Sequence, residues 1–243
     1  MVIFDEGKHT YFNPDTKRFY ISVSKLLSLY KEPFDKDYHA NRVALREGVK
    51  KEDVINRWAK TTELACEKGI NVHSIVEKYI KTGIVDDNAL IDALSLVFNK
   101  KDYKRILSEE IVYNDTYEIA GTSDIICDVN NNLFDVYDFK TNKSFTFENK
   151  YNKCLKSPLQ NLQQCHYNDY SLQLSLYAFL YGDLTNKKVR KISILYHDGN
   201  KFHRYPVPYM FWEVSALLKH YTINHNTATP IEDKLMDDYK VVD

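Results

Sequence analysis

The chain has 243 residues, of which 44% are hydrophobic and 28% are charged, as in an ordinary globular protein with a substantial core. Its formal net charge of -1 gives no general attraction to nucleic acid, so any DNA contact must come from a local patch. No apolar run is long enough to span a bilayer, and MVIFDEGKHTYF lacks the regions of a signal peptide. Because the four cysteines are scattered, we expect reduced thiols, an intracellular (cytoplasmic) location and no membrane partner.

Helical signals dominate the first part of the chain. A short helix is predicted in SVSKLLSLY, which has a serine start signal. A longer one runs through DVINRWAKTTELACEKG and is predicted to end at Gly69. NVHSIVEKYIKTG then carries apolar residues on one helical face and ends at Gly83, and another helix is predicted in DNALIDALSLVFNK.

The pattern then changes to strands, which are predicted in RILSEEIVY, YEIAGTSDIICDV and LFDVYDFK. A polar stretch from residue 141 to about residue 168 is predicted to be a long loop, and long loops are often functional. After it, DYSLQLSLYAFLYG is typical of a helix, VRKISILYH of a strand and PYMFWEVSALLKHY of a closing helix. This order predicts a mixed α/β fold in which helices flank a central, mostly antiparallel or mixed sheet.

The sequence indicates no boundary between domains. Seven glycines and six prolines leave no flexible linker, and no repeat or low-complexity tract is present. We therefore expect one domain over residues 1–243. It would comprise a mainly helical N-terminal part (1–105), a sheet core (106–200) and a C-terminal helical closure (201–243).

Two of the strand-like segments carry charges where burial is expected. Asp124 interrupts SDIICDV, and Asp138 and Lys140 interrupt LFDVYDFK. A buried charge is costly unless it is paired or bound to a metal. If the asparagines at 130–132 form a three-residue turn, Asp124 lies opposite Asp138, and the period of two places Lys140 on the face of Asp138.

Carboxylates directly opposite each other repel, because their Cβ atoms lie only about 5 Å apart. A hard divalent cation such as Mg²⁺ relieves this repulsion, since it binds through a few carboxylate oxygens, water and substrate phosphate. Glu109 and Glu110 on the preceding strand supply one further carboxylate on this face, and the pattern leaves open which one. A solvent-exposed sheet face with ordinary charges is the alternative interpretation of the hairpin alone.

Two predicted helices carry polar pairs at helical spacing. His73 and Glu77 stand at i and i+4 in GINVHSIVEKYI, and Gln173 and Tyr177 do so in YSLQLSLY. Each pair alone is more typical of a structural contact than of a site. With the carboxylates of the hairpin, they form a candidate set for binding metal and a phosphate or base.

Taken in chain order, these motifs resemble the PD-(D/E)XK nuclease superfamily, in particular the RecB-like and phage exonuclease branch. GINVHSIVEKYI resembles its helix motif, EEIVYNDTYEIAGTSD its glutamate and glycine–aspartate motif, DFK its core and QLSLY its later helix. HTYFNPDTKRFYISVSKLL and LQQCHYNDYSLQLSLY are most similar to phage-encoded members. The resemblance implies a restriction-endonuclease-like core and is strongest from Gly69 to Tyr181.

The resemblance also implies a set of site residues. His73, Asp124 and Asp138 would bind Mg²⁺ or Mn²⁺, and the carbonyl oxygen of Phe139 would be a further ligand. Lys140 would orient or activate the attacking water and steady the charge at phosphorus.

Further residues follow from the same resemblance. Glu109 fits the catalytic glutamate better than Glu110 by its distance to Gly121. Gln173 and Tyr177 would form an accessory catalytic motif that also contacts the substrate. Independently of the resemblance, the long loop is long enough to read a substrate, and its lysines are expected to follow the phosphate backbone: Lys143, Lys150, Lys153 and Lys156. A flexible basic loop is the alternative.

The function implied is a metal-dependent deoxyribonuclease, in the first place an exonuclease of phage-type DNA replication, recombination or processing in the host cytoplasm. Its partners would be linear DNA and other replication or recombination proteins. The alternatives are a structure-specific or restriction-like endonuclease and a catalytically silent DNA-binding or assembly module. No iron–sulfur cluster is expected, because no cysteine follows Cys165.

Overall fold

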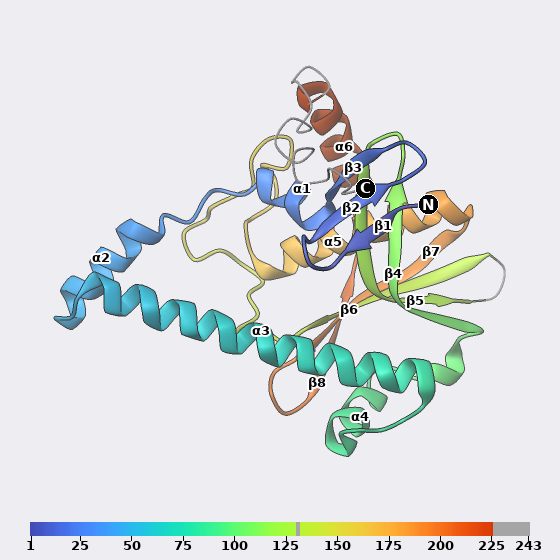
Figure 1. The fold of residues 1–243 in the computed structure, drawn as a ribbon, viewed down its shortest axis with the longest axis horizontal. Coiled ribbons are helices and arrows are strands. Elements are labelled where there is room, and N and C mark those ends of the chain that lie inside the picture. The colour runs from blue at the N-terminus through green and yellow to red at the C-terminus, as the bar shows by residue number, and fades with distance from the viewer. Residues whose placement is uncertain (130–131, 226–243) are drawn as a thin grey trace, which may run out of the picture.

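The computed structural model describes residues 1–129 and 132–225 (Figure 1). Within this part, eight strands form one mixed sheet and six α-helices accompany it. The predicted mixed α/β fold with a helical region near the N-terminus is therefore confirmed. None of the helices in the described ranges combines the length and the apolar character needed to cross a membrane.

The sheet has the order β1-β2-β3-β5-β6-β7-β8, and β4 is an additional strand that pairs with β5. β3 is parallel to β5 and β6 is parallel to β7, whereas the other pairs are antiparallel. The strands are β1 (Ile3–Asp5), β2 (Thr10–Asn13), β3 (Arg18–Ser22), β4 (Arg105–Asn114), β5 (Ile119–Asp128), β6 (Leu133–Lys140), β7 (Lys188–His197) and β8 (Phe202–Val207).

Helices cover both faces of this sheet. α1, α5 and α6 pack on one face in a cluster that includes Ile126 and Val136. On the other face, α4 and the C-terminal half of α3 pack against Ile125 and Tyr137. The helices are α1 (Val23–Leu29), α2 (Lys36–Glu47), α3 (Lys51–Thr82), α4 (Asn88–Ser95), α5 (His166–Thr185) and α6 (Phe211–His225).

Four strands lie where the sequence predicts none. β1, β2 and β3 have only three to five residues each, too few for a period-two pattern to stand out. β8 lies in the predicted helical closure, and its Pro206 is a residue that argues against a strand. Pro206 is tolerated because β8 is the last strand of the sheet order. Residues 226–243 of that closure lie outside the described residues.

The prediction that a helix ends at Gly69 is wrong. α3 continues from Lys51 to Thr82 and ends at Gly83, whose positive φ of 78° suits a glycine cap. A Cβ atom at Gly69 would lie 3.3 Å from Oγ1 of Thr141, so glycine permits a close approach of α3 to the chain that follows β6. Gly69 therefore marks a packing contact and not a helix end.

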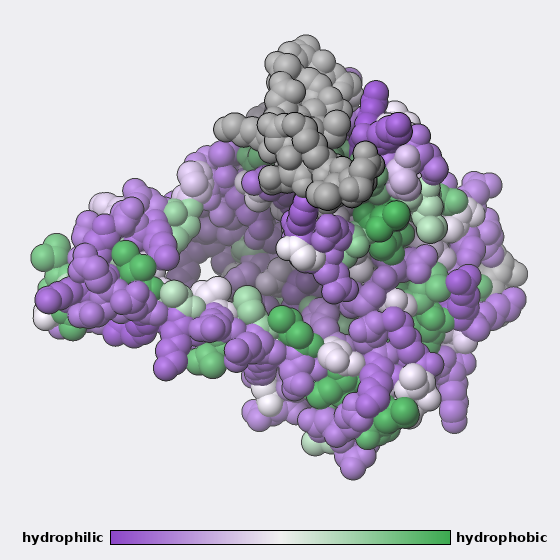
Figure 2. Space-filling view, viewed as in Figure 1, coloured by the Kyte–Doolittle hydropathy of each residue, from purple (hydrophilic) through white to green (hydrophobic). Residues whose placement is uncertain are grey.

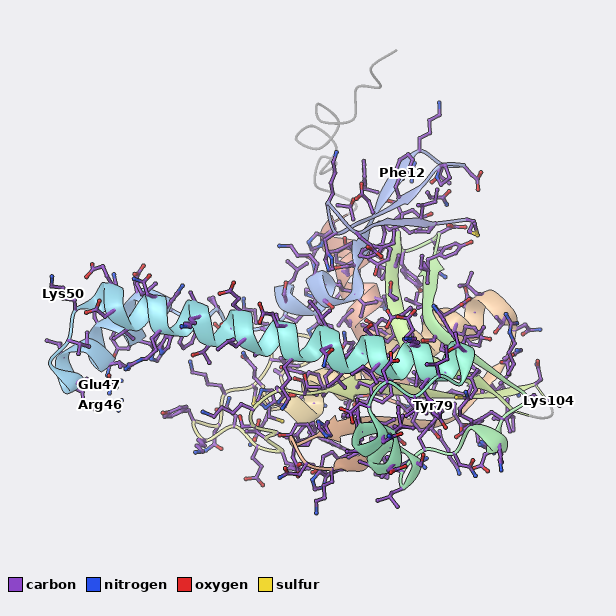
Figure 3. The ribbon with its side chains drawn as sticks, turned by 60° about the horizontal axis from the view of Figure 1, so that its bottom comes forward. Phe12, Arg46, Glu47, Lys50, Tyr79 and Lys104 are labelled. Atoms are coloured by element: carbon purple, nitrogen blue, oxygen red, sulfur yellow. The ribbon has the colours of Figure 1, made fainter. Side chains whose placement is uncertain are left out.

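α2 and the N-terminal half of α3 form an arm that projects from the body (Figure 1). Figure 3 places Arg46, Glu47 and Lys50 at the tip of the arm and Tyr79 toward the other end of α3. The arm has its own small apolar cluster, centred on Ala40, Ala44 and Val54. We call α2 and residues 51–68 of α3 the arm.

The β5–β6 hairpin has the predicted register. Ile125 pairs with Tyr137 and Asp128 pairs with Phe134, an offset that places Asp124 opposite Asp138. Asn132 has a φ of 61°, the left-handed conformation for which an asparagine turn was expected. Asn130 and Asn131 lie outside the described residues.

An ion pair between the buried Asp135 and the partly exposed Arg190 links β6 to β7. Asp135 has no exposed side-chain surface, and Arg190 of β7 donates to its two oxygens from Nε at 2.9 Å and from a terminal nitrogen at 2.7 Å. The Tyr103 hydroxyl donates to the same carboxylate at 3.3 Å. This bidentate contact compensates for the burial of the charge.

We expect Arg190→Met to lower the free energy of unfolding by about 3 kcal/mol, because it leaves the Asp135 charge buried without its partner. Lys188→Met is the matched control, since Lys188 is exposed on the same strand. It should change stability by no more than about 0.5 kcal/mol. Urea unfolding measures both, and equal stability of the two variants would contradict the role given to the ion pair.

Candidate metal centre

The site lies where β5 has no strand on one side. β3 pairs with β5 at Ile119 and Ala120, and β6 pairs with it only from Ile125 onward. The edge between these pairs ends at Asp124. The carboxylate of Asp124 accepts a hydrogen bond from the backbone N–H of Phe139 at 2.7 Å and so takes the place of a ladder acceptor.

Strict alternation of side chains also breaks at this point. Ile119 and Ile126 belong to the same core cluster although one position is odd and the other even. The regular period of two therefore does not hold across Asp124. On β4, Glu109 has a φ of 54°, an uncommon conformation for a residue other than glycine, and it stands opposite Asp124 in the register. Charges thus occupy a position that belongs to neither regular face.

Three side chains from three elements converge here. A nitrogen of His73 on α3, a carboxylate oxygen of Glu109 on β4 and one of Asp124 on β5 all lie within 4.8 Å of one another. Nδ1 of His73 lies 3.6 Å from Oδ2 of Asp124, and the His73 ring makes an edge contact with Phe139. Imidazole and carboxylate are ordinary ligands of divalent cations, so this group can hold a metal ion.

The electrostatics of the group fit a cation. Burial raises the pKa of Asp124, and the charge of Asp138 raises it further. Glu109 keeps contact with solvent, but partial desolvation and then the charge of Asp124 raise its pKa to about 7. Both carboxylates are therefore difficult to ionise together, and a positive ion between them would favour the charged forms.

Asp138 and Lys140 form an ion pair beside this group. Asp138 is 2% exposed, and the Lys140 ammonium contacts its carboxylate and lies 4.7 Å from the centre of the Tyr170 ring. Burial disfavours the ammonium, but the charges of Asp138 and Asp124 outweigh it, so that the pKa of Lys140 is raised. Lys140 therefore remains a cation. The ion pair confirms that Asp138 and Lys140 share one face.

Gln173 and Tyr177 lie one turn apart on α5, as predicted, and contact each other. Nε2 of Gln173 donates to the Tyr177 hydroxyl at 3.1 Å and to the Ser24 hydroxyl at 3.4 Å. Tyr177 is only 4% exposed. Its ring lies against Gly121, where an added Cβ atom would be 2.6 Å from Cε1 of the tyrosine. Gly121 is thus the residue that lets α5 approach β5 next to the site.

Other predicted residues lie apart from the centre. Glu77 forms an ion pair with Lys81 on the surface of α3. Glu110 of β4 pairs with Ser123 of β5. Lys143 and Lys150 are exposed on the loop 141–165 that follows β6. Their predicted contact with phosphate remains a prediction.

Tyr170 is the site residue that the sequence analysis misses. It lies one turn before Gln173 on α5 and faces Lys140. The helical spacing of Tyr170, Gln173 and Tyr177 in DYSLQLSLY was the available signal. An aromatic residue at that spacing is equally typical of a core position, and the contact with Lys140 depends on how α5 docks on the sheet.

No protein-family model matches the chain, and no curated protein matches it. Among solved structures, SSO0001 has a TM-score of 0.38 and 17% identity, covering 85% of this chain and 76% of its own. A protein from Eubacterium rectale described as a candidate exonuclease has a TM-score of 0.37 and 10% identity, covering 92% and 89%.

We expect Gly121→Ala to destabilise the protein by about 1–3 kcal/mol, because the new methyl group would overlap the Tyr177 ring. The double variant Gly121→Ala/Tyr177→Leu should recover part of this loss. Thermal unfolding measures both. Gly7→Ala is a control, since its Cβ would meet only Asp5 Oδ1 at 3.4 Å, and an equal effect at Gly7 and Gly121 would contradict the packing argument.

We expect Mn²⁺ to raise the melting temperature of the protein, because a ligand of the folded state stabilises it by mass action. Glu109→Gln should reduce this Mn²⁺-dependent shift, since it removes a carboxylate of the converging group. Glu110→Gln, the matched control one position along β4, should leave the shift unchanged. If the Mn²⁺-dependent shift is lost in Glu110→Gln and kept in Glu109→Gln, Glu110 and not Glu109 binds the metal.

Proposed function

We propose that this protein is a Mg²⁺- or Mn²⁺-dependent deoxyribonuclease that hydrolyses phosphodiester bonds in DNA. The observation that carries the proposal is the convergence of His73, Glu109 and Asp124 beside the Asp138–Lys140 pair. The order of the sequence motifs, which resembles the PD-(D/E)XK superfamily, supports it. The proposed unit of function is residues 1–243.

The donor set suits a hard divalent cation. Glu109 and Asp124 offer carboxylate oxygens and His73 a ring nitrogen, and Asp138 would be a further ligand by the family resemblance. A cation held there would supply Lewis-acid activation of water and neutralisation of phosphate charge. The hydrogen bond from the Phe139 N–H fixes one oxygen of Asp124 and so orients the carboxylate toward His73 and Glu109.

Lys140 would act as a fixed positive charge. Its raised pKa keeps the ammonium protonated at neutral pH, so it would not serve as a general base in this state. Asp138 and the Tyr170 ring hold the ammonium in place from two sides. A protonated Lys140 would bind a phosphate oxygen and stabilise the charge that develops at phosphorus.

Exonuclease action in phage-type replication, recombination or processing is the proposed role, and it is supported by the resemblance to phage-encoded members. Gln173 would approach the substrate from α5, since it is only partly buried and its amide is oriented by Tyr177 and Ser24. Linear DNA is the proposed substrate. Other replication or recombination proteins are the proposed partners.

We expect the wild-type protein with Mg²⁺ or Mn²⁺ to shorten end-labelled linear DNA, and Asp124→Ala, Asp138→Ala and Lys140→Ala to abolish cleavage. Each of these substitutions removes a charge from the centre. Gel analysis of linear and closed circular DNA measures the activity, and circular dichroism checks that each variant is folded. Lys188→Ala, at the opposite end of the β6–β7 pair, is the control and should keep full activity.

Three outcomes would contradict the proposal. Full activity of any of the three variants under controlled metal concentration would remove that residue from the site. Cleavage of closed circles, which have no free end, would show an endonuclease and not an exonuclease. Absence of cleavage on every DNA form, with metal bound, would favour the catalytically silent binding module.

A further inference from the structure

The arm, the loop 141–165 and residues 30–35 form a closed ring beside the metal centre. At one end of the loop, Thr141 contacts α3 at Gly69. Farther along the loop, the backbone N–H of Lys156 donates to the carbonyl of Tyr30 at 2.8 Å. Gln164 accepts from the Glu32 N–H at 3.1 Å and donates to its carbonyl. The loop therefore connects α3 to the segment that leads back into the arm.

Figure 2 shows an opening through the molecule between the arm and the body. Along one border of the ring, residues 59–68 of α3 are all exposed. Ala59 and Thr62 lie beside Phe34 and Lys36, and the Lys68 ammonium lies near Gly199. At 1.5 Å per residue, this exposed part of α3 is about 15 Å long.

An aromatic pocket of about 360 Å³ lies on the arm side of the ring. It is lined by Phe34 and Lys36 at the start of the arm and by Trp58, Ala59 and Thr62 of α3. Phe34 is 66% exposed although its ring stacks on His39 and lies 6.1 Å from the Trp58 ring. An exposed aromatic face beside a lysine is the arrangement on which unpaired bases stack.

The opposite border carries positive charge. Lys143, Lys150, Lys153 and Lys156 are exposed on the loop 141–165 and form no ion pair within residues 1–129 and 132–225. Glu148 is the one acidic residue of this loop. A loop with excess positive charge and an aromatic pocket, both on the same ring, complement the phosphates and the unpaired bases of a single strand.

The ring is continuous with the metal centre. Thr141 directly follows Lys140, and Gly69 lies one helical turn before His73 on α3. From these observations we propose that the ring is a passage for a single DNA strand with a free end, which holds an unpaired base against Phe34 and Trp58. Binding of the strand does not depend on the proposed nuclease function, whereas its cleavage does. The substrate proposed for that function is a single-stranded DNA end.

Binding without cleavage tests the passage independently of the nuclease function. With EDTA present, a fluorescent linear single strand should bind, measured by anisotropy. A closed circle of the same sequence, which cannot be threaded, and a blunt duplex should not bind at concentrations that saturate with the linear strand. Equal binding of circle and linear strand, or no binding of the linear strand, would overturn the passage.

The aromatic pocket has its own variants. Phe34→Ala should weaken binding of the linear strand about ten-fold, whereas Phe34→Tyr, which keeps the ring, should bind as the wild type does. Phe34 is mostly exposed, so the change should leave the fold intact. Trp212→Ala removes an aromatic residue that is 79% exposed on α6 and serves as the control. Unchanged affinity in Phe34→Ala would remove the pocket from the passage.

The loop lysines are tested by salt dependence. Lys150→Ser/Lys153→Ser should reduce the slope of log affinity against log salt by about 1.4, the value for two phosphate contacts on a single strand. Lys188→Ser/Lys191→Ser is the matched control on β7, where both lysines are exposed, and should leave the slope unchanged. Equal slopes in all three proteins would overturn the assignment of the loop.

The two proposals can fail separately. Binding of linear single strands through Phe34, with no cleavage after Mg²⁺ or Mn²⁺ is added, would leave the passage standing and reject the nuclease. Cleavage of linear DNA that is unaffected by Phe34→Ala and accompanied by equal binding of circles would do the reverse.

Discussion

The arrangement of the candidate site depends on one constraint: β5 has two different strand partners on the same side, β3 at its start and β6 at its end. Between them a short edge has no strand to pair with, and a backbone N–H of β6 would lose its acceptor. Asp124 supplies that acceptor by binding the N–H of Phe139. The same carboxylate is therefore held in place by the sheet while it lies close to His73 and Glu109. One side chain thus supplies both a backbone hydrogen-bond acceptor and a carboxylate of the candidate metal centre.

The charges at this edge balance only in part within the protein. Asp138 is paired with Lys140, whereas the pKa values of Asp124 and Glu109 are both raised. Burial is the main cause for each, followed by the charge of Asp138 at Asp124 and the charge of Asp124 at Glu109. A group of this kind is less stable when fully charged than when a cation is bound or a proton is shared. Stability and ligand binding are thus opposed at the site, which is typical of functional positions.

Much of this site could be predicted from the sequence because its central features are local. The register of the β5–β6 hairpin follows from its turn length, and it places Asp124 opposite Asp138 whatever the rest of the chain does. Features that depend on docking between distant elements could not be predicted. Gly69 has the signal of a helix end, but its meaning comes from Thr141. Tyr170 has the spacing of a core residue, and its contact with Lys140 exists only because α5 crosses that end of the sheet.

The exposed part of α3 follows from the same reasoning. Residues 59–68 contain two alanines, two lysines, two glutamates and a leucine, which favour a helix, whereas the two threonines and the like charges of Glu63 and Glu67 at i and i+4 oppose it. This segment persists because both ends are packed, by Ala40 and Val54 in the arm and by the apolar face that precedes Gly83 in the body. Along this length the neighbours of the helix are few: Phe34 and Lys36 lie beside Ala59 and Thr62, and Gly199 lies near Lys68. In the proposed passage, this segment would hold the two borders of the ring apart, while α3 carries His73, a ligand of the candidate metal, at its packed end.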